Sequence, residues 1–331
     1  MVTYDKPHLT YEQQLARLVE RGMPYRDHAA ALSSLKRTGY YRLSAYTYSF
    51  RKRDADGVVE SQFVDGSSLE AAVDLHDFDV KLRATLLAGL EAFEVALRVQ
   101  IAYTLGRRDK YGHLDPENAL DGGFCGHPAD SSDPGGRTRY DIWLTKYDKR
   151  CKDAEREDFV KHFKEKYDGR LPIWAATEVM DLGLIARLYG FLLRDDRVKI
   201  SRNFGPRREP DFRAWTKSLN LLRNHCAHGD RIWNRSFTYT LPEFATGAID
   251  SRLDHLASSP DLMRRKLYSL AAVLASVLTT VDPYSNWPRS FATQAKKLPG
   301  VPQVVTHQMM GFPSDWQELE LWKYQPVARG R

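Results

Sequence analysis

Residues 69–106 read LEAAVDLHDFDVKLRATLLAGLEAFEVALRVQIAYTLG and form the longest helix-compatible stretch of the chain. The stretch contains no proline, and Gly89 is its only glycine before the end. Apolar residues recur every three or four positions, at Leu82, Leu86, Leu90, Phe93, Leu97, Ile101 and Leu105. This spacing predicts one long amphipathic helix, or two helices that join near 77–79. Ser67-Ser68-Leu69-Glu70 has the pattern of a capping box at the start of this region.

Helical patterns also occupy the N-terminal side of this stretch. Thr10-Tyr11-Glu12-Gln13 matches a capping box, and a second helix is expected over about 27–38. The tyrosine-rich segment 39–50 fits either a strand or a helix with an aromatic face, because its apolar residues follow neither period cleanly. Its tyrosines could form a base-stacking surface or part of the core.

Further helices are expected on the C-terminal side, over 142–167, after Pro172, over 182–192, from Pro210 to Gly229 and over 261–280. Between them and the long helix, residues 107–139 lose the helical pattern and carry paired glycines and prolines, which predicts a long flexible insertion. The expected fold class is therefore mostly α, a helical bundle. We expect three parts: a helical and aromatic N-terminal segment over 1–66, the bundle over 67–282 and a C-terminal extension over 283–331.

Bulk composition indicates a soluble protein. The chain has 331 residues, of which 42% are hydrophobic and 28% charged. No apolar run approaches the roughly 20 residues that span a bilayer, and the first residues lack the apolar core of a signal peptide. We therefore expect a cytoplasmic protein without membrane association. Three cysteines, with no CxxC pair and no zinc-site spacing, indicate neither disulfides nor structural zinc, so no metal and no cofactor are expected.

Positive charge is concentrated in one window. Residues 194–235 hold eleven Lys and Arg against five Asp and Glu, so this window alone equals the formal charge of +6 of the whole chain. Such a concentration favours a polyanionic partner such as RNA. We expect four arginines to position phosphates: Arg202, Arg207, Arg208 and Arg213. The alternative is that they form only a solvated basic face.

The basic window ends in residues 219–235, LNLLRNHCAHGDRIWNR. A histidine such as His228 can take a proton from a ribose 2′-hydroxyl, and an arginine such as Arg223 can neutralise charge that builds on a phosphate. The alternative is a helix end whose cations only favour the helix dipole. After this pair, Arg231, Trp233, Asn234 and Arg235 are candidate RNA contacts, although Trp233 could instead pack under the helix.

Helix geometry constrains a site built from this pair. At about 100° per residue, Arg223 and His228 lie about 140° apart around one straight helix, whereas Asn224 and His228 share a face. A symmetric dimer removes the difficulty, because two copies of the segment can complete one site. A homodimer is therefore expected.

The segment Arg223-Asn224-His225-Cys226-Ala227-His228 also resembles the R-N-x-x-x-H form of the R-x4-6-H signature of the HEPN superfamily. Other segments are similar, in order, to blocks of its Abi-like branch (abortive infection, AbiD/AbiF type): 6–14, 39–44, 91–98, 171–174, 182–183, 231–235 and 311–316. The resemblance covers nearly the whole chain, although the insertion over 107–139 matches no block.

This resemblance implies a dimeric HEPN bundle that acts in phage defence or in a toxin–antitoxin system. It implies a metal-independent endoribonuclease that leaves 2′,3′-cyclic phosphate ends, or else a non-catalytic RNA-binding protein controlled by a cognate small noncoding RNA. A scaffold that only mediates protein association is a third possibility.

By position, Arg223 and His228 would be the catalytic pair and Asn224 would orient the site. On the long helix, Glu94 would position the pair and Arg98 would touch phosphate, unless the two form only a surface ion pair. His225 adds a second imidazole to the supporting residues.

Overall fold

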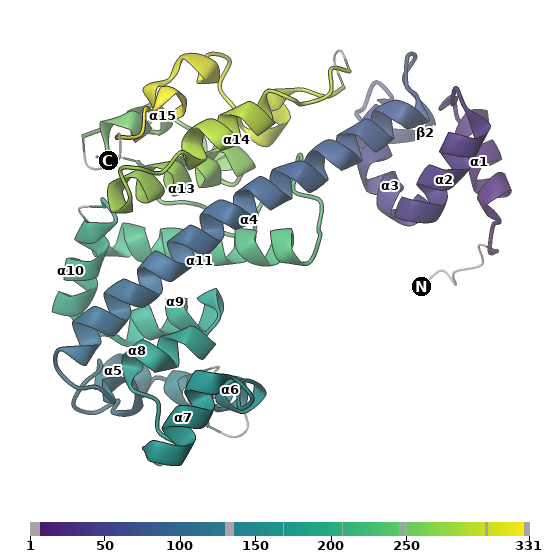
Figure 1. Ribbon diagram of the computed structural model, residues 1–331. Coiled ribbons are helices and arrows are strands. Elements are labelled where there is room, and N and C mark those ends of the chain that lie inside the picture. Colours follow the sequence, from purple (N-terminus) through teal and green to yellow (C-terminus); the bar gives the residue numbers. More distant parts are fainter. Residues whose placement is uncertain are drawn as a thin grey trace.

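The long helix is a single element in the computed structural model, which describes residues 7–129, 136–167, 169–206, 208–244, 246–247, 250–301 and 304–327. Helix α4 (Leu69–Gly106) has no break near 77–79, and every apolar residue that predicted its inward face is buried. Figure 1 shows α4 as the axis of the molecule, with the N-terminal helices at one end and α8 and α9 near the other.

The cap of α4 differs from the expected capping box. Ser68, not Ser67, is the N-cap residue, and its side chain accepts a hydrogen bond from the backbone N–H of Ala71. Glu70 does not return to the cap, because its carboxylate accepts a hydrogen bond from the backbone N–H of Arg26 (2.7 Å). The predicted capping box was therefore wrong: the N-cap is one residue later, and the Glu70 carboxylate bonds Arg26 instead of the N-cap backbone.

The N-terminal part consists of α1 (Tyr11–Glu20), α2 (His28–Thr38) and α3 (Tyr40–Thr47), followed by a small sheet. Thr10 and Gln13 form the predicted capping box of α1. The tyrosine-rich segment is helical, and its Tyr46 is buried. Strands β1 (Arg51–Arg53) and β2 (Val59–Phe63) pair antiparallel, with Arg51 opposite Phe63. The sequence patterns did not predict this hairpin.

Much of the expected flexible insertion packs against the bundle. Within 107–129 it forms a 3-10 turn (Gly112–Leu114) and helix α5 (Gly122–Cys125). The backbone N–H of Asp121 donates to the carbonyl of Phe191 (2.8 Å). His113 is buried, and desolvation lowers its pKa to about 4. This part was therefore not the loop that its glycines predicted, because buried side chains hold it; residues 130–135 lie outside the described part of the chain.

Six helices complete the central part: α6 (Arg139–Asp153), α7 (Asp158–Lys166), α8 (Ile173–Ala176), α9 (Leu182–Phe191), α10 (Arg194–Asn203) and α11 (Glu209–Ala227). Helix α11 contacts α4, α9, α10 and α13. Phe212, Trp215, Leu219 and Leu222 are its buried face, as their spacing predicted. Pro210 lies in its first turn, and Gly229 follows its end with a φ of +70°. The helix that carries the candidate site is thus fixed against the core along its length.

The C-terminal part covers one side of α4 and α11. The helix expected over 261–280 is two helices, α12 (Asp261–Arg264) and the almost fully buried α13 (Leu267–Val281). Helices α14 (Trp287–Ala295) and α15 (Glu320–Lys323) follow, and α14 contacts α4 (Figure 1). No described helix has both the length and the apolar character that a membrane crossing requires.

Candidate functional site at the end of helix α11

The RNxxxH segment lies at the C-terminal end of α11. Arg223, Asn224 and His225 belong to its last turns, and the helix ends at Ala227. His228 occupies the C-cap position, where its backbone N–H donates to the carbonyl of Asn224 (2.9 Å). The His228 side chain is exposed, whereas Arg223 and Asn224 are half-buried. The histidine is therefore available to a ligand, and the arginine is held closer to the protein.

Glu94 of α4 holds Arg223 from the neighbouring helix. Glu94 is buried, and its Oε2 lies 4.0 Å from Nε of Arg223. Desolvation raises the pKa of Glu94 above its ordinary value, while the charges of Arg98 and Arg223 oppose that rise. A buried carboxylate between two guanidinium groups restricts where Arg223 can point. This geometry agrees with the positioning role expected for Glu94.

Arg98 is engaged inside the protein. Its guanidinium donates to Oε1 of Glu94 (2.5 Å) and to the backbone carbonyl of Met180 (2.6 Å), and it lies 3.6 Å from Glu178. The ion pair between Arg98 and Glu94 is therefore largely buried, and the alternative of a solvated surface pair is wrong. Both of these hydrogen bonds use Nη2, so Arg98 connects α4 to the backbone before α9, and its expected contact with a phosphate stays a prediction.

His225 forms a dyad with a residue that the sequence patterns did not single out. Its Nδ1 lies 2.7 Å from Oδ2 of Asp230. The hydrogen bond with His225 lowers the pKa of Asp230, so this carboxylate stays charged at neutral pH. Asp230 is fixed in turn, because Arg83 donates to its backbone carbonyl (3.1 Å). The dyad ties the last turn of α11 to the loop that follows.

A buried aspartate of α4 anchors this loop. Asp79 accepts hydrogen bonds from the backbone N–H groups of Trp233 (2.7 Å) and Ile232 (3.3 Å), from the Tyr46 hydroxyl (2.8 Å) and from Arg83 (2.5 Å). Burial raises the pKa of Asp79, and the charge of Arg83 opposes the rise. Trp233 is 0% exposed. Its ring packs in the core, as the alternative prediction of packing under the helix stated. The prediction that RNA stacks on Trp233 is therefore wrong.

The other candidate RNA contacts in this loop also have partners within the protein. Arg231 donates to the backbone carbonyl of Ala45 (2.6 Å), and Arg235 donates to that of Arg231 (2.7 Å). Asn234 accepts from the Lys266 ammonium (3.3 Å). Desolvation lowers the pKa of Arg231. These side chains hold the loop against α3 and α13, so the loop forms part of the support of the site.

The upstream arginines do not form one cluster. Arg202 lines a shallow hollow on α10 together with Lys199. Arg208 is exposed beside Asp211, at 3.6 Å. Arg213 lies on α11 and lines a pocket that reaches Asn224. Arg207 lies outside the described residues. Of the three arginines that the structure describes, Arg213 alone lines the same pocket as a residue of the RNxxxH segment.

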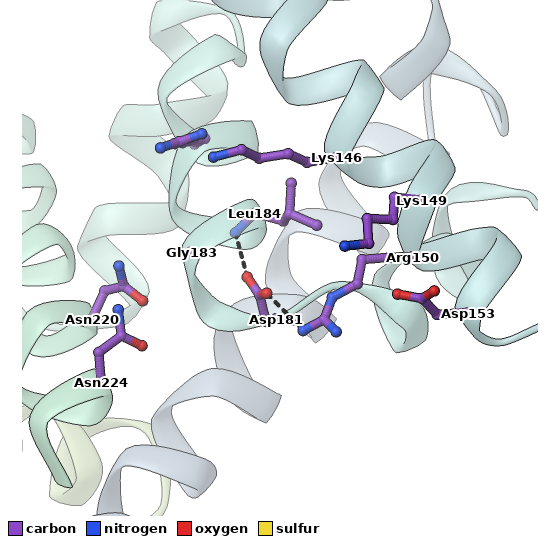
Figure 2. Close-up of a pocket in the computed structure, with 10 residues that line it drawn as sticks. Lys146, Lys149, Arg150, Asp153, Asp181, Gly183, Leu184, Asn220 and Asn224 are labelled. Atoms are coloured by element: carbon purple, nitrogen blue, oxygen red, sulfur yellow. Dashed lines mark hydrogen bonds and ion pairs between the residues drawn. The ribbon is translucent and has the colours of Figure 1, made fainter. Parts of the chain in front are cut away.

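Two adjoining pockets lie between α6, α9 and α11, and we call them together the α6–α9–α11 groove. Their volumes are about 320 and 590 Å³. They share Gly183, Arg187, Asn220 and Asn224. Figure 2 shows the smaller pocket, with Lys146, Lys149 and Arg150 of α6 facing Asn220 and Asn224 of α11. Asp181 caps α9 through the N–H of Leu184 (2.9 Å) and accepts from Arg150 (2.7 Å).

The groove brings together seven cationic side chains and two acidic ones, Asp153 and Asp181. Apart from Arg213, these cations were not among the residues predicted from the sequence to bind RNA. The spacing of Lys146, Lys149 and Arg150 by three and four positions could have indicated a basic face on α6. The cations are Lys146, Lys149, Arg150, Arg139, Arg187, Arg213 and Lys217. Among the described residues, no group of three or more His, Cys, Asp or Glu side chains is placed to hold a metal ion.

A family profile described as Abi-like protein matches residues 33–234. The match contains α4, the α6–α9–α11 groove except Tyr239, and the RNxxxH segment with its loop. No curated protein and no solved structure matches the chain. Because the profile covers more than half of the 331 residues, this chain belongs to the Abi-like protein family.

Proposed function

We propose that this Abi-like protein acts in abortive infection, or in a related toxin–antitoxin system, as a metal-independent endoribonuclease of the HEPN type. The proposal rests on the arrangement of side chains at the C-terminal end of α11. There an exposed histidine and an arginine held by a buried glutamate lie on the same helix as Asn224, which lines a basic groove. Membership of the Abi-like family supports the defence setting.

The residues suit cleavage through the ribose 2′-hydroxyl. The imidazole of His228 takes the proton from this hydroxyl, and the 2′ oxygen attacks the adjacent phosphorus. Arg223 stabilises the charge that builds on the phosphate oxygens. The bond from phosphorus to the 5′ oxygen breaks, and that oxygen takes up a proton. The products carry a 2′,3′-cyclic phosphate and a 5′-hydroxyl.

A homodimer is part of this proposal. An ideal helix separates positions 223 and 228 by about 140°, and His228 follows the last helical residue as the C-cap. We therefore propose that one copy does not aim both side chains at a single phosphate. On α4, next to Glu94, three apolar side chains at successive helical turns point to solvent: Val95 (50% exposed), Val99 (56%) and Tyr103 (62%). Exposed apolar rows of this kind mark interfaces. A second copy packed on this row would bring two RNxxxH segments near each other.

The groove also supports a second candidate, a non-catalytic RNA-binding protein controlled by a cognate small noncoding RNA. Its cations lie beside Asn224 and do not include Arg223 or His228. Charge alone can bind RNA without cleaving it.

Cleavage in the presence of EDTA tests the first candidate. We expect purified protein to cut members of an RNA panel and to leave 2′,3′-cyclic phosphates. Arg223→Ala and His228→Ala should each lower the rate by at least about 100-fold, whereas His162→Ala, at an exposed histidine of α7, should not. Thermal unfolding should be unchanged in His228→Ala and His162→Ala, whose side chains are exposed. Arg223→Ala should unfold at a somewhat lower temperature, because the buried Glu94 loses one of its two cations.

The outcomes separate the candidates. RNA that binds with a steep salt dependence but stays intact points to the non-catalytic protein. Activity that survives both substitutions contradicts the assignment of the catalytic pair. If RNA is neither bound nor cut, both candidates are wrong and the scaffold function remains.

A further inference from the structure

We infer that the α6–α9–α11 groove binds an unpaired nucleotide of the RNA, with its phosphate in the smaller pocket and its base in the larger one. This inference rests on the proposed RNA function and adds to it the place and the form of the bound strand. It concerns side chains of α5, α6, α9, α11 and the segment after α11, and of these only Asn224 belongs to the RNxxxH segment.

The smaller pocket offers charge to an anion. Lys146, Lys149 and Arg187 are exposed and make no hydrogen bond or ion pair with any other described residue. Arg150 is occupied by Asp181. In Figure 2 the ammonium groups of Lys146 and Lys149 extend toward the pocket from α6. Free cations from two helices around one hollow favour a phosphate, which can accept from each of them.

The larger pocket offers flat surfaces to a base. Lys217 lies over the ring of Tyr239, with Nζ 3.9 Å from its centroid, and Arg139 lies over the ring of Phe124 at 4.9 Å. Bases stack on aromatic rings and on guanidinium planes of this kind. The other apolar side chains that line this pocket are Ala129, Ile142, Ala186, Phe191 and Leu221. A volume of about 590 Å³ is in the range of pockets that take small organic groups.

Asn220 and Asn224 connect the two pockets, since both amides line each of them. An amide can donate to a phosphate oxygen or bond the edge of a base. Arg223 donates from Nη1 to Oδ1 of Asn224 (3.5 Å), so a nucleotide held at Asn224 is next to one member of the candidate catalytic pair. The groove would then place the neighbouring phosphodiester beside Arg223 of the same copy, where His228 of the second copy would complete the proposed site.

A base can enter this recess only when it is neither paired nor stacked. A-form duplexes present phosphates and 2′-hydroxyls outward and keep their bases inside. The groove therefore fits a single strand, a loop or a bulge, and rejects a continuous duplex. A flat basic face would bind single strands and duplexes alike. Because the groove is recessed, we predict that the protein prefers unpaired RNA.

Fluorescence anisotropy with short RNAs tests this inference in a His228→Ala background, where the RNA should stay intact. We expect Lys149→Glu/Arg187→Glu to weaken single-strand binding at least tenfold and to lower its salt slope. Tyr239→Ala should weaken it about tenfold with an unchanged salt slope, because stacking carries no charge. The matched control is Lys296→Glu/Lys297→Glu at the exposed end of α14, outside the groove, where the same charge change should alter affinity less than threefold.

Each contrary result has its own meaning. If the α14 variant loses as much affinity as the groove variant, the groove is not the place where RNA binds and the groove inference is overturned, while the proposed RNA function stands. Duplex RNA that binds as tightly as the single strand overturns the unpaired nucleotide. If the protein binds no RNA at all, the proposed function itself is contradicted.

Discussion

Asp79 decides the position of the loop behind the candidate site. Its carboxylate accepts from two backbone N–H groups of that loop, from Tyr46 and from Arg83. Four donors on one buried carboxylate satisfy its hydrogen-bonding capacity and offset part of the cost of burial. The charge is structural, because it connects α3, α4 and the segment after α11.

We expect Asp79→Asn to lower the free energy of unfolding by about 3 kcal/mol, because it leaves the buried Arg83 guanidinium without its counter-charge. Asp77→Asn is the matched control two residues away. Asp77 pairs with Arg37 at the surface, where both side chains are partly exposed, so its loss should cost less than about 1 kcal/mol. Urea unfolding measures both. Equal effects of the two substitutions would show that Asp79 does not anchor the loop.

At the scale of elements, α4 and α14 approach closely at a glycine. A Cβ at Gly89 would lie 2.5 Å from the indole ring of Trp287, whose Nε1–H donates to the carbonyl of Thr85 (2.8 Å). No other residue type fits there without movement of the ring. This contact fixes the described part of the C-terminal extension on the long helix.

Gly89→Ala should therefore destabilise the protein by about 1–3 kcal/mol through overpacking. Helix propensity alone predicts the opposite, a gain of about 1 kcal/mol. In a Trp287→Ala background the clash is absent, and Gly89→Ala should then stabilise or be neutral. A double-mutant cycle from thermal or urea unfolding measures this coupling, and a coupling of zero contradicts the close packing of α4 with α14.

At the scale of the whole molecule, the α4 row of Val95, Val99 and Tyr103 is the proposed contact with a second copy. We expect Val99→Asp/Tyr103→Asp to convert a dimer into a monomer in light-scattering measurements and to lower cleavage with it. Burial of two carboxylates in an apolar contact is unfavourable. Val58→Asp, at another exposed valine, should leave the dimer intact. A wild-type monomer that cleaves RNA contradicts the composite site.

Mixing two inactive proteins tests the composite site more directly. If each site takes Arg223 from one copy and His228 from the other, a heterodimer of Arg223→Ala with His228→Ala contains one site with both residues intact. Activity should then return on mixing and subunit exchange. If both residues come from the same copy, every site in the mixture lacks one of them, and no activity returns.

Local patterns in the sequence predicted the parts of this protein that depend on neighbours three or four residues apart. The buried face of α4, the cap of α1 and the end of α11 at Gly229 follow from such spacing. The RNxxxH segment and the Abi-like resemblance were likewise readable in the sequence, and the family match confirms the latter.

Only the tertiary structure decided which side chains remain free for a ligand. Arg231 and Arg98 were candidate RNA contacts in the sequence, but hydrogen bonds with distant residues hold them. For Trp233 the sequence left RNA stacking and packing under the helix open, and its burial decides for packing. Lys149 and Tyr239, far apart in the chain, line two adjoining pockets. The physical reason is that a helical period fixes which face of a helix is apolar, whereas the partner of each polar group depends on how separate helices pack.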